Sequence, residues 1–335
     1  MHYLGIDVSK ATLDVSDPSG DNRVSSTNSR LGIRKLVKWA QAKHASNKVF
    51  QFVIEPTSTY HHVLLDELSN SDIAFTVINP ARTKAYSNSL GRRAKTDRVD
   101  AQVLASLGQT QQVVPSHQPE RFQEQIKSLR RHRESIEQQV FSVRNRIEAA
   151  THSPWPDPEV LRSLRSTVRH LEKQAGLADQ RLEQLISEDE IHSTTSELLQ
   201  TIPGVGPKTA QLLISEMPPA WQCSTSRAWV AFAGVCPQPF QSGASSYSRL
   251  SRMGSRRVRA GMYMAAVVSM KSNPAIVELV TRLKERGKGG KLIVMAAMNK
   301  LIRICYGVIK TRKPFNPTLN IAPENRLISK TASEF

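Results

Sequence analysis

Two apolar heptad ladders in the middle of the chain constrain its fold more than any other feature. The first occupies residues 122–147, with spacings that alternate between four and three residues and one polar break at Arg133. The second occupies residues 161–185 and alternates without a break. Apolar positions at this spacing form one stripe along a helix, so each ladder predicts a long helix with one buried face.

The segment between the ladders, residues 153–158, reads SPWPDP and contains three prolines. Proline removes a backbone donor and clashes with the preceding turn, so no helix can cross this segment. We therefore expect two helices joined by a short loop within a helical insertion at residues 116–192. Two arrangements remain open: an antiparallel hairpin within one chain and a coiled coil between chains.

The region before the ladders alternates short apolar runs with segments of helical periodicity. The predicted strands are residues 3–8, 12–15, 49–54 and 74–78, and the predicted helices are residues 31–42, 61–68 and 96–107. Strands that alternate with helices predict an α/β layer sandwich. Pro115 and Pro119 end this pattern, so we expect a first domain over residues 1–115.

Four carboxylates in this domain suggest a metal site. Asp7 and Glu55 each lie where a buried run ends, and Asp97 and Asp100 share one face of a predicted helix. Carboxylates brought together repel one another, and Mg²⁺, with Mn²⁺ as the alternative, would relieve that repulsion. Two such ions about 4 Å apart can stabilise the attacking and leaving oxygens of a phosphodiester. This order of acids is typical of the ribonuclease-H-like fold.

Each acid also has a structural interpretation of its own. Asp97 can cap its helix together with Thr96, and Glu55 before Pro56 can simply end a strand. A first strand followed by Gly-Ile-Asp also fits the actin-like fold of sugar kinases. That fold needs a glycine-rich phosphate loop, and the only candidate, residues 204–206, lies among helices in the C-terminal region.

The charge of the chain is concentrated in its last third. Residues 1–200 carry 26 basic and 24 acidic side chains, whereas residues 201–335 carry 20 basic and 5 acidic ones. A surplus of this kind predicts a polyanionic partner, most often nucleic acid. Mean hydropathy is −0.37, which disfavours a membrane surface. Three scattered cysteines favour neither a zinc site nor a disulfide framework, so we expect a protein of the reducing cytoplasm. When active on nucleic acid, it would be associated with the nucleoid.

Residues 202–210 are similar to the helix-hairpin-helix turn of DNA-binding proteins. Gly204 and Gly206 would let backbone N–H groups approach a phosphate at a helix N-terminus, and Lys208 would add a positive charge. A purely structural turn between two helices is the alternative.

Residues 232–255 contain six serines next to several arginines. No histidine lies nearby, so a serine that attacks DNA here would need activation by a metal or an arginine. The residues alone do not choose the nucleophile, and a flexible basic loop that binds phosphate is the alternative. The candidate phosphate contacts are Arg249, Arg252, Arg256 and Arg257. Predicted helices follow at residues 258–270, 274–285 and 291–310.

Several motifs occur in a characteristic order. In the N-terminal half they are Y-x-G-I-D-V-S-K at 3–10, I-E-P-T-S-T-Y at 54–60, V-I-N-P at 77–80 and K-T-D-R-V-D-A at 95–101. In the C-terminal half they are I-P-G-V-G-P-K-T-A at 202–210, F-A-G-V-C-P-Q-P-F-Q-S-G at 232–243, S-R-M-G at 251–254 and K-L-I-V-M-A-A-M-N-K-L-I at 291–302. Over nearly the whole chain, the sequence resembles the DEDD-type transposases of the insertion-sequence 110/1111 family. This is the Piv/MooV-like group of bridge-RNA-guided recombinases.

The resemblance implies metal ligands at Asp7, Glu55, Asp97 and Asp100 and a nucleophile at Ser242. It implies a RuvC-like, ribonuclease-H-like α/β domain at 1–115, a coiled-coil hairpin at 116–192 and a mainly helical transposase domain at 193–335. The expected activity is that of a site-specific DNA recombinase that cuts and rejoins DNA through a covalent serine–DNA intermediate. A structured guide RNA would pair with donor and target DNA. Strand exchange between two duplexes needs several active sites, so we expect a homodimer or homotetramer.

Two other functions remain as alternatives. A RuvC-like junction endonuclease without a covalent intermediate would need the four acids, but neither the serine nor a basic extension. A nucleic-acid-binding adaptor with a degenerate nuclease fold would have lost at least one carboxylate, whereas all four are present.

Overall fold

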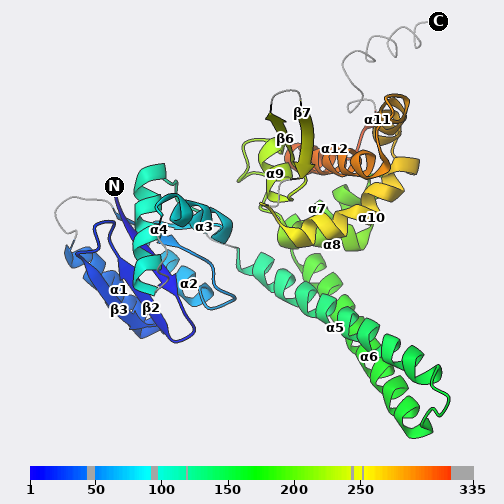
Figure 1. The fold of residues 1–335 in the computed structure, drawn as a ribbon, viewed down its shortest axis with the longest axis horizontal. Helices are drawn as coiled ribbons and strands as arrows, with labels where there is room; N and C mark the ends of the chain where they lie inside the picture. Colours follow the sequence, from blue (N-terminus) through cyan, green and yellow to red (C-terminus); the bar gives the residue numbers. More distant parts are fainter. Residues whose placement is uncertain (44–49, 92–96, 118–119, 243–244, 251–252, 318–335) are drawn as a thin grey trace, which may run out of the picture. The chain divides into compact units, whose positions relative to one another are not determined.

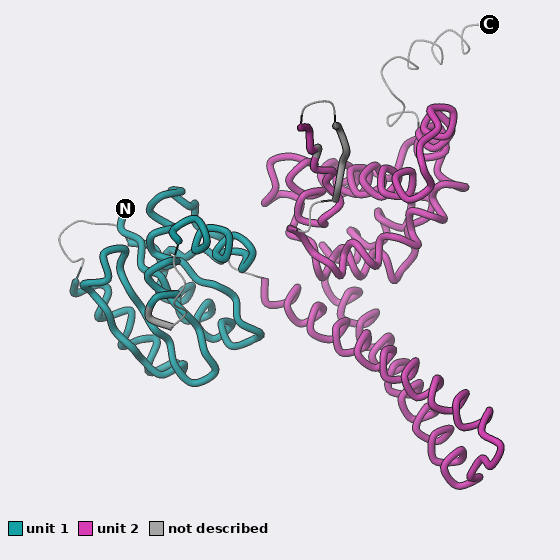
Figure 2. Tube along the Cα trace, in the orientation of Figure 1, with its two compact units in different colours: residues 1–119 teal, residues 120–335 magenta. Residues whose placement is uncertain are grey.

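The computed structural model describes residues 1–43, 50–91, 97–117, 120–242, 245–250 and 253–317. For residues 97–98, 239 and 245–250 it describes only the backbone. The chain divides into two compact units, residues 1–119 and residues 120–335 (Figure 2). Unit 1 contains all of the acidic candidates, and unit 2 contains Ser242 and the basic candidates.

Unit 1 is built on a five-stranded sheet with the strand order β3-β2-β1-β4-β5 (Figure 1). The strands are β1 (His2–Val8), β2 (Thr12–Ser16), β3 (Arg23–Thr27), β4 (Phe50–Ile54) and β5 (Phe75–Val77). The strand β2 is antiparallel to both β1 and β3, whereas β1, β4 and β5 run parallel to one another. The four predicted strands are confirmed. The sequence did not reveal β3, because RVSST has no apolar run and lies at the sheet edge.

Helices cover both faces of this sheet. The helices α1 (Arg30–Lys43) and α2 (His62–Asn70) share a core with Leu4 and Ile6 of β1. On the other face, α4 (Asp97–Gln111) contributes Leu104 to a core with Tyr3 and Val53, and α3 (Pro80–Ser89) packs beside it. The expected α/β layers are therefore confirmed.

The helix α4 lies directly on β1. A Cβ atom at Gly5 would come within 1.9 Å of the Ala101 carbonyl oxygen and 2.6 Å of the Ala105 nitrogen, so any side chain there would push the helix away. Farther along α4, a Cβ atom at Gly108 would meet Tyr3 Cδ1 at 2.9 Å. The helix therefore runs against the direction of β1, and its N-terminal end lies over the carboxyl end of that strand.

Unit 2 begins with a helical hairpin made of α5 (Arg121–Thr151) and α6 (Pro158–Glu188), which lie side by side (Figure 1). Asp157 caps α6 by accepting hydrogen bonds from the backbone of Glu159 and Val160. Every position of both ladders is buried or half-buried. The polar break is explained by an ion pair across the hairpin, in which Arg133 Nε lies 2.9 Å from Asp179 Oδ1.

The remaining elements of unit 2 form a mainly helical body around one core. They are α7 (Glu190–Gln200), α8 (Pro207–Glu216), α9 (Ser226–Phe232), β6 (Pro237–Ser242), β7 (Ser245–Leu250), α10 (Arg256–Ser272), α11 (Pro274–Glu285) and α12 (Gly290–Thr311). Ile126 and Leu182 from the base of the hairpin belong to the same core as Trp229 and Leu301. The division of this region into domains at 116–192 and 193–335 stays a prediction.

The C-terminal helix α12 has the length and composition of a membrane-spanning helix. In the structure, 50% of the apolar 18-residue stretch of this helix is buried inside the protein. Leu301, Ile302 and Cys305 are fully buried there, so α12 serves as the central core helix of unit 2.

The strands β6 and β7 form an antiparallel hairpin that the sequence did not predict, because PQPFQS contains two prolines and no apolar alternation. Two glycines close its base. A Cβ atom at Gly254 (φ 155°) would lie 2.4 Å from Gly234 Cα and 2.8 Å from the Ala231 carbonyl oxygen. The Ser255 N–H donates to the Phe232 carbonyl oxygen at 2.7 Å. We call the contact between Gly234 and Gly254 the glycine clasp.

An ion pair between Arg131 and Glu216 joins the helical hairpin to α8, and we call it the Glu216 anchor. The side chain of Glu216 is only 4% exposed and accepts hydrogen bonds from Arg131 Nε at 2.8 Å and Nη2 at 2.9 Å. Burial alone would raise the pKa of this carboxyl. The hydrogen bonds and charge of Arg131, with the charges of Arg130 and Lys127, outweigh burial and lower the pKa. The ionised carboxylate therefore stabilises the folded state.

We predict that Gly254→Ala destabilises unit 2 by about 2–4 kcal/mol, because the new methyl group collides with backbone atoms that cannot move separately. Urea denaturation measures the change. The matched control is Gly176→Ala in α6, where a Cβ atom meets nothing within 4 Å. That control should stabilise the protein by about 0.5–1 kcal/mol. Equal and small effects for both variants would contradict a rigid clasp.

We also predict that Glu216→Gln lowers the free energy of unfolding by about 2–3 kcal/mol at pH 7, since it removes the charge of a buried carboxylate that pairs with Arg131 and Arg130. The folded-state pKa of Glu216 lies below its ordinary value of 4.5, so its contribution is complete above that pH. The contribution is lost as the pH falls through the lower, folded-state pKa.

Denaturation of the wild type and the variant at pH 7 and pH 3 measures this dependence. The difference between the two proteins should shrink at the lower pH. Glu197→Gln, at an exposed position on the adjacent helix α7, is the control and should change stability little at either pH. Equal stability of Glu216→Gln and the wild type at pH 7 would refute the anchor.

Candidate functional site

Asp7 and Glu55 lie at the carboxyl ends of two neighbouring parallel strands. Ile6 of β1 pairs with Ile54 of β4, and each acid is the next residue along its chain. Alternation along the strands directs both side chains to the face that carries Gly5 and α4. The structure therefore brings these two predicted site residues to one edge of the sheet, and both are half-buried.

The first turn of α4 approaches the same edge. Asp100 is half-buried and directly precedes Ala101, the residue that touches Gly5. Asp97 is the first residue of α4, but its side chain lies outside the described residues. Since α4 runs against β1, both acids belong to the helix end that lies over the carboxyl end of the strand.

The structure adds an acid that the sequence did not reveal. Asp14 of β2 pairs directly with Asp7 of β1, so the two side chains are cross-strand neighbours on one face. Like charges in this position destabilise a sheet. Among the side chains that the structure describes, no group of three or more His, Cys, Asp or Glu is close enough to hold a metal ion. No sequence signal marked Asp14, because only strand pairing places it beside Asp7.

The turn that resembles a helix-hairpin-helix motif joins α7 to α8. Gly204 has φ 96°, and a Cβ atom there would lie 2.0 Å from Ser269 Oγ of α10. The Ser269 hydroxyl donates to the Pro203 carbonyl oxygen at 3.0 Å, so Gly204 packs against the body of unit 2. Gly206, the N-cap of α8, has open space around it, and Lys208 is exposed. The exposed side of this turn is therefore the start of α8.

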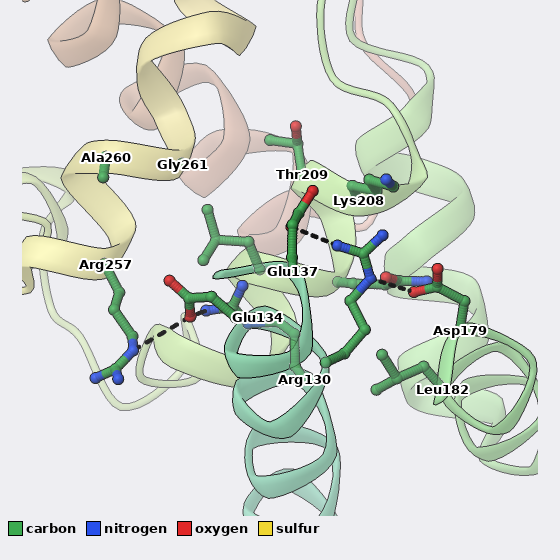
Figure 3. A pocket seen from close by; sticks show the side chains of 13 residues that line it. Arg130, Glu134, Glu137, Asp179, Leu182, Lys208, Thr209, Arg257, Ala260 and Gly261 are labelled. Atoms are coloured by element: carbon green, nitrogen blue, oxygen red, sulfur yellow. Dashed lines mark hydrogen bonds and ion pairs between the residues drawn. The ribbon is translucent and has the colours of Figure 1, made fainter. Parts of the chain in front are cut away.

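A cavity of about 220 Å³ lies where the base of the helical hairpin meets α8 and α10 (Figure 3). Two candidate nucleic-acid contacts from distant parts of the sequence, Lys208 and Arg257, line it together. Arg257 Nε donates to Glu134 Oε2 at 3.3 Å, and Arg133 pairs with Glu137 and Asp179. Four basic and three acidic side chains line this cavity, so most of its positive charge is compensated.

Two further basic candidates belong to β7 and to the start of α10. Arg256 is exposed at the start of α10. Arg249 lies on β7 opposite Gln238, but its side chain is not described. Arg252 lies outside the described residues.

Ser242 is the last residue of β6 and is exposed. It pairs with Ser245, and residues 243–244 lie outside the described residues. Among the described residues, none forms a hydrogen bond with the Ser242 side chain. Six residue pairs separate this end of the hairpin from its base at the glycine clasp. Ser242 therefore lies on a regular strand. The sequence alone was also compatible with a flexible loop at this position.

Two family models match the chain. Residues 4–156 match a model for the DEDD transposases of IS110, described as a transposase. Residues 196–281 match the model described as the transposase IS116/IS110/IS902 family. The first match contains all four acidic candidates, and the second contains the turn at Gly204 and the β6–β7 hairpin.

Similar proteins extend over both units. The chain is 31% identical to the pilin gene-inverting protein of Moraxella bovis over 95% of this chain and 98% of that protein. It is 30% identical to the pilin gene-inverting protein of Moraxella lacunata over the same shares of the two chains. An uncharacterized 43.6 kDa protein of insertion element IS110 from Streptomyces coelicolor is 25% identical over 34% of this chain and 29% of its own. The two family matches, together with similarity over almost the whole length of the two pilin gene-inverting proteins, show that this protein belongs to the IS110 family of transposases and is a DNA recombinase.

Proposed function

We propose that the protein cuts and rejoins DNA through a covalent link between Ser242 and the DNA, assisted by divalent metal at Asp7, Glu55, Asp97 and Asp100. The observation that carries this proposal is the position of Ser242. It is exposed at the end of a clasped hairpin, in the part of the chain that carries 20 basic and only 5 acidic side chains. A hydroxyl in this place is accessible to a phosphodiester.

The architecture of unit 1 supports a ribonuclease-H-like, RuvC-like fold. In the sheet order, the antiparallel strands β3 and β2 come first. The strands β1, β4 and β5 follow and are mutually parallel. The helix α4 packs on the face to which Asp7 and Glu55 point. This arrangement agrees with the order of acids that is typical of that fold.

The residues at the sheet edge suit Mg²⁺ or Mn²⁺. Carboxylate oxygens are hard ligands, which these ions prefer, and the pairing of Asp7 with Asp14 places like charges together. A cation between the strands would relieve that repulsion. When bound, the ion would polarise the phosphodiester and favour an ionised nucleophile.

The proposed reaction conserves the number of phosphodiester bonds. Ser242 Oγ attacks the phosphorus, its bond to phosphorus forms, and the bond to one flanking deoxyribose oxygen breaks. The released hydroxyl takes up a proton, and Ser242 has given one up. In the second step a hydroxyl of the new partner strand attacks, the serine ester breaks, and Ser242 regains its proton. Because each step exchanges one ester for another, rejoining needs no external energy source.

The relatives support rejoining over simple hydrolysis. Two of them are named for inverting a pilin gene, and inversion requires that both cut strands be joined again. A junction endonuclease that passes phosphate to water would lose the ester at the first step. A protein nucleophile retains it.

We further propose that donor and target DNA and a structured guide RNA bind this protein, which acts in the cytoplasm as a homodimer or homotetramer. The excess of basic residues after position 200 supports binding of nucleic acid. Gly206, Lys208 and Arg256 are exposed and therefore available for phosphate contacts. Arg257 is half-exposed, but its pairing with Glu134 leaves less charge for a phosphate.

We predict that Asp7→Asn lowers the rate of DNA strand cleavage in Mg²⁺ by about 10²–10³-fold, because it removes one charged ligand while keeping the size of the side chain. Binding of DNA, measured by fluorescence anisotropy, should stay unchanged. The control is Asp21→Asn, at an exposed loop position of unit 1, which should cleave normally. Full recombination by Asp7→Asn in Mg²⁺ would exclude Asp7 as a ligand.

We predict that Ser242→Ala forms no protein–DNA adduct, because the alanine has no oxygen to attack phosphorus. Labelled DNA and a denaturing gel detect the adduct, and anisotropy should show normal DNA binding. Ser245→Ala, opposite Ser242 on β7, is the matched control and should still form the adduct. An adduct of undiminished yield from Ser242→Ala would assign the nucleophile elsewhere. Cleavage without any adduct in the wild type would favour the junction endonuclease.

A further inference from the structure

A second cavity of about 860 Å³ lies in unit 2 and is lined by none of the residues discussed as nucleic-acid contacts. Its apolar side is formed mainly by Val235, Leu292 and Met295. Its basic side chains include Arg227 of α9 and Lys291 and Arg303 of α12. We call it the basic groove. No acidic side chain lines it, in contrast to the mixed cavity at the base of the helical hairpin.

Two cations at the basic groove are exposed and lack an ion pair with a described carboxylate. They are Arg227 and Lys291. Arg303 Nε donates to Asn299 Oδ1 at 2.8 Å, which is a neutral amide. Burial, together with the charges of Arg303 and Arg282, lowers the pKa of Lys300 despite the opposing charge of Glu278. The groove therefore combines an apolar floor with a positive potential.

This combination fits unpaired nucleotides. An unstacked base offers a flat apolar face, which aliphatic side chains can cover, and its flanking phosphates are anionic. A DNA duplex could make only the phosphate contacts. Its base faces are stacked on one another and cannot reach the apolar side chains of the groove. The volume lies within the range of pockets that bury most of a small organic ligand, which leaves room for one or two nucleotides.

The groove also lies at the start of the strand that bears the candidate nucleophile. Cys236 and Pro237 line it, and Ser242 is five residues further along β6. At about 3.3 Å per residue, this separation is roughly 17 Å. The Asn299 amide donates to the Val235 carbonyl oxygen at 3.2 Å and so ties α12 to the chain just before β6.

We propose that the basic groove binds unpaired nucleotides of the DNA strand that is cut, a short distance from the phosphodiester presented to Ser242. The link to the cut strand rests on the proposed function. The binding of unpaired nucleotides rests on the groove alone. DNA is favoured because it is the substrate of a recombinase and because the groove includes Pro237, the first residue of the strand that carries Ser242.

The test uses the full-length protein and a fluorescein-labelled 12-nucleotide single strand, free or annealed to its complement. The double variant Arg227→Ala/Lys291→Ala removes two exposed charges, and Leu292→Glu places an acid on the apolar side at a position that is 48% exposed. Each should weaken single-strand binding by about 10-fold or more, as expected for the loss of stacking and phosphate contacts. Duplex binding should fall less than single-strand binding in each variant, because a duplex can use only the phosphate contacts. Lys271→Ala, an exposed cation of α10 outside the groove, is the control and should leave both affinities unchanged.

Unchanged single-strand affinity in both variants, with wild-type thermal melting, would overturn the proposal. A larger loss for a single-stranded RNA of the same sequence than for DNA would overturn the assignment to DNA. A change in sedimentation of Leu292→Glu with intact DNA binding would instead identify a second copy of the chain as the occupant.

The variant Ser242→Ala separates this proposal from the proposed function. If Ser242 is not the nucleophile, that variant still forms adducts, and the affinity losses in the groove variants are still expected. If the groove is not a nucleotide site, adduct formation still depends on Ser242 while the groove variants bind single strands normally. Each outcome therefore contradicts only one of the two proposals.

Discussion

The close contact between α4 and β1 decides where the acidic residues of unit 1 can lie. A backbone carbonyl of α4 occupies the space that a side chain at Gly5 would need, so helix and strand approach without any intervening atoms. Because the helix runs against the strand, its first turn comes to the edge where Asp7 and Glu55 follow the ends of β1 and β4. The pairing of β2 with β1 adds Asp14 beside Asp7.

In unit 2, glycines again allow two backbone segments to approach closely. The glycine clasp holds the base of a hairpin that has few apolar residues of its own, and Gly204 packs in a similar way against α10. Glu216 joins the helical hairpin to α8 through Arg131, so the hairpin and the body share one core. The glycine clasp therefore fixes the base of the short two-stranded hairpin on which Ser242 lies.

The basic residues of unit 2 fall into two classes that composition does not distinguish. Arg133 and Arg257 pair with carboxylates and chiefly hold helices together. Arg227 and Lys291 pair with no described carboxylate and surround an apolar cavity. Charges of the second class attract phosphates more strongly, because they form no ion pair with a described carboxylate.

The sequence alone determined the elements whose signal is local. Heptad spacing predicted α5 and α6, apolar runs predicted four strands of unit 1, and the motifs predicted the family and the candidate site residues. The polar edge strand β3 and the proline-containing hairpin β6–β7 could not be predicted, since pairing with a neighbouring strand stabilises them and neither has an apolar alternation of its own. Likewise, only the tertiary structure decided that Asp14 lies beside Asp7 and that Arg227, Lys291 and Arg303 surround one cavity. Proximity in space between residues far apart in the chain depends on strand register and helix packing, which local periodicity does not encode.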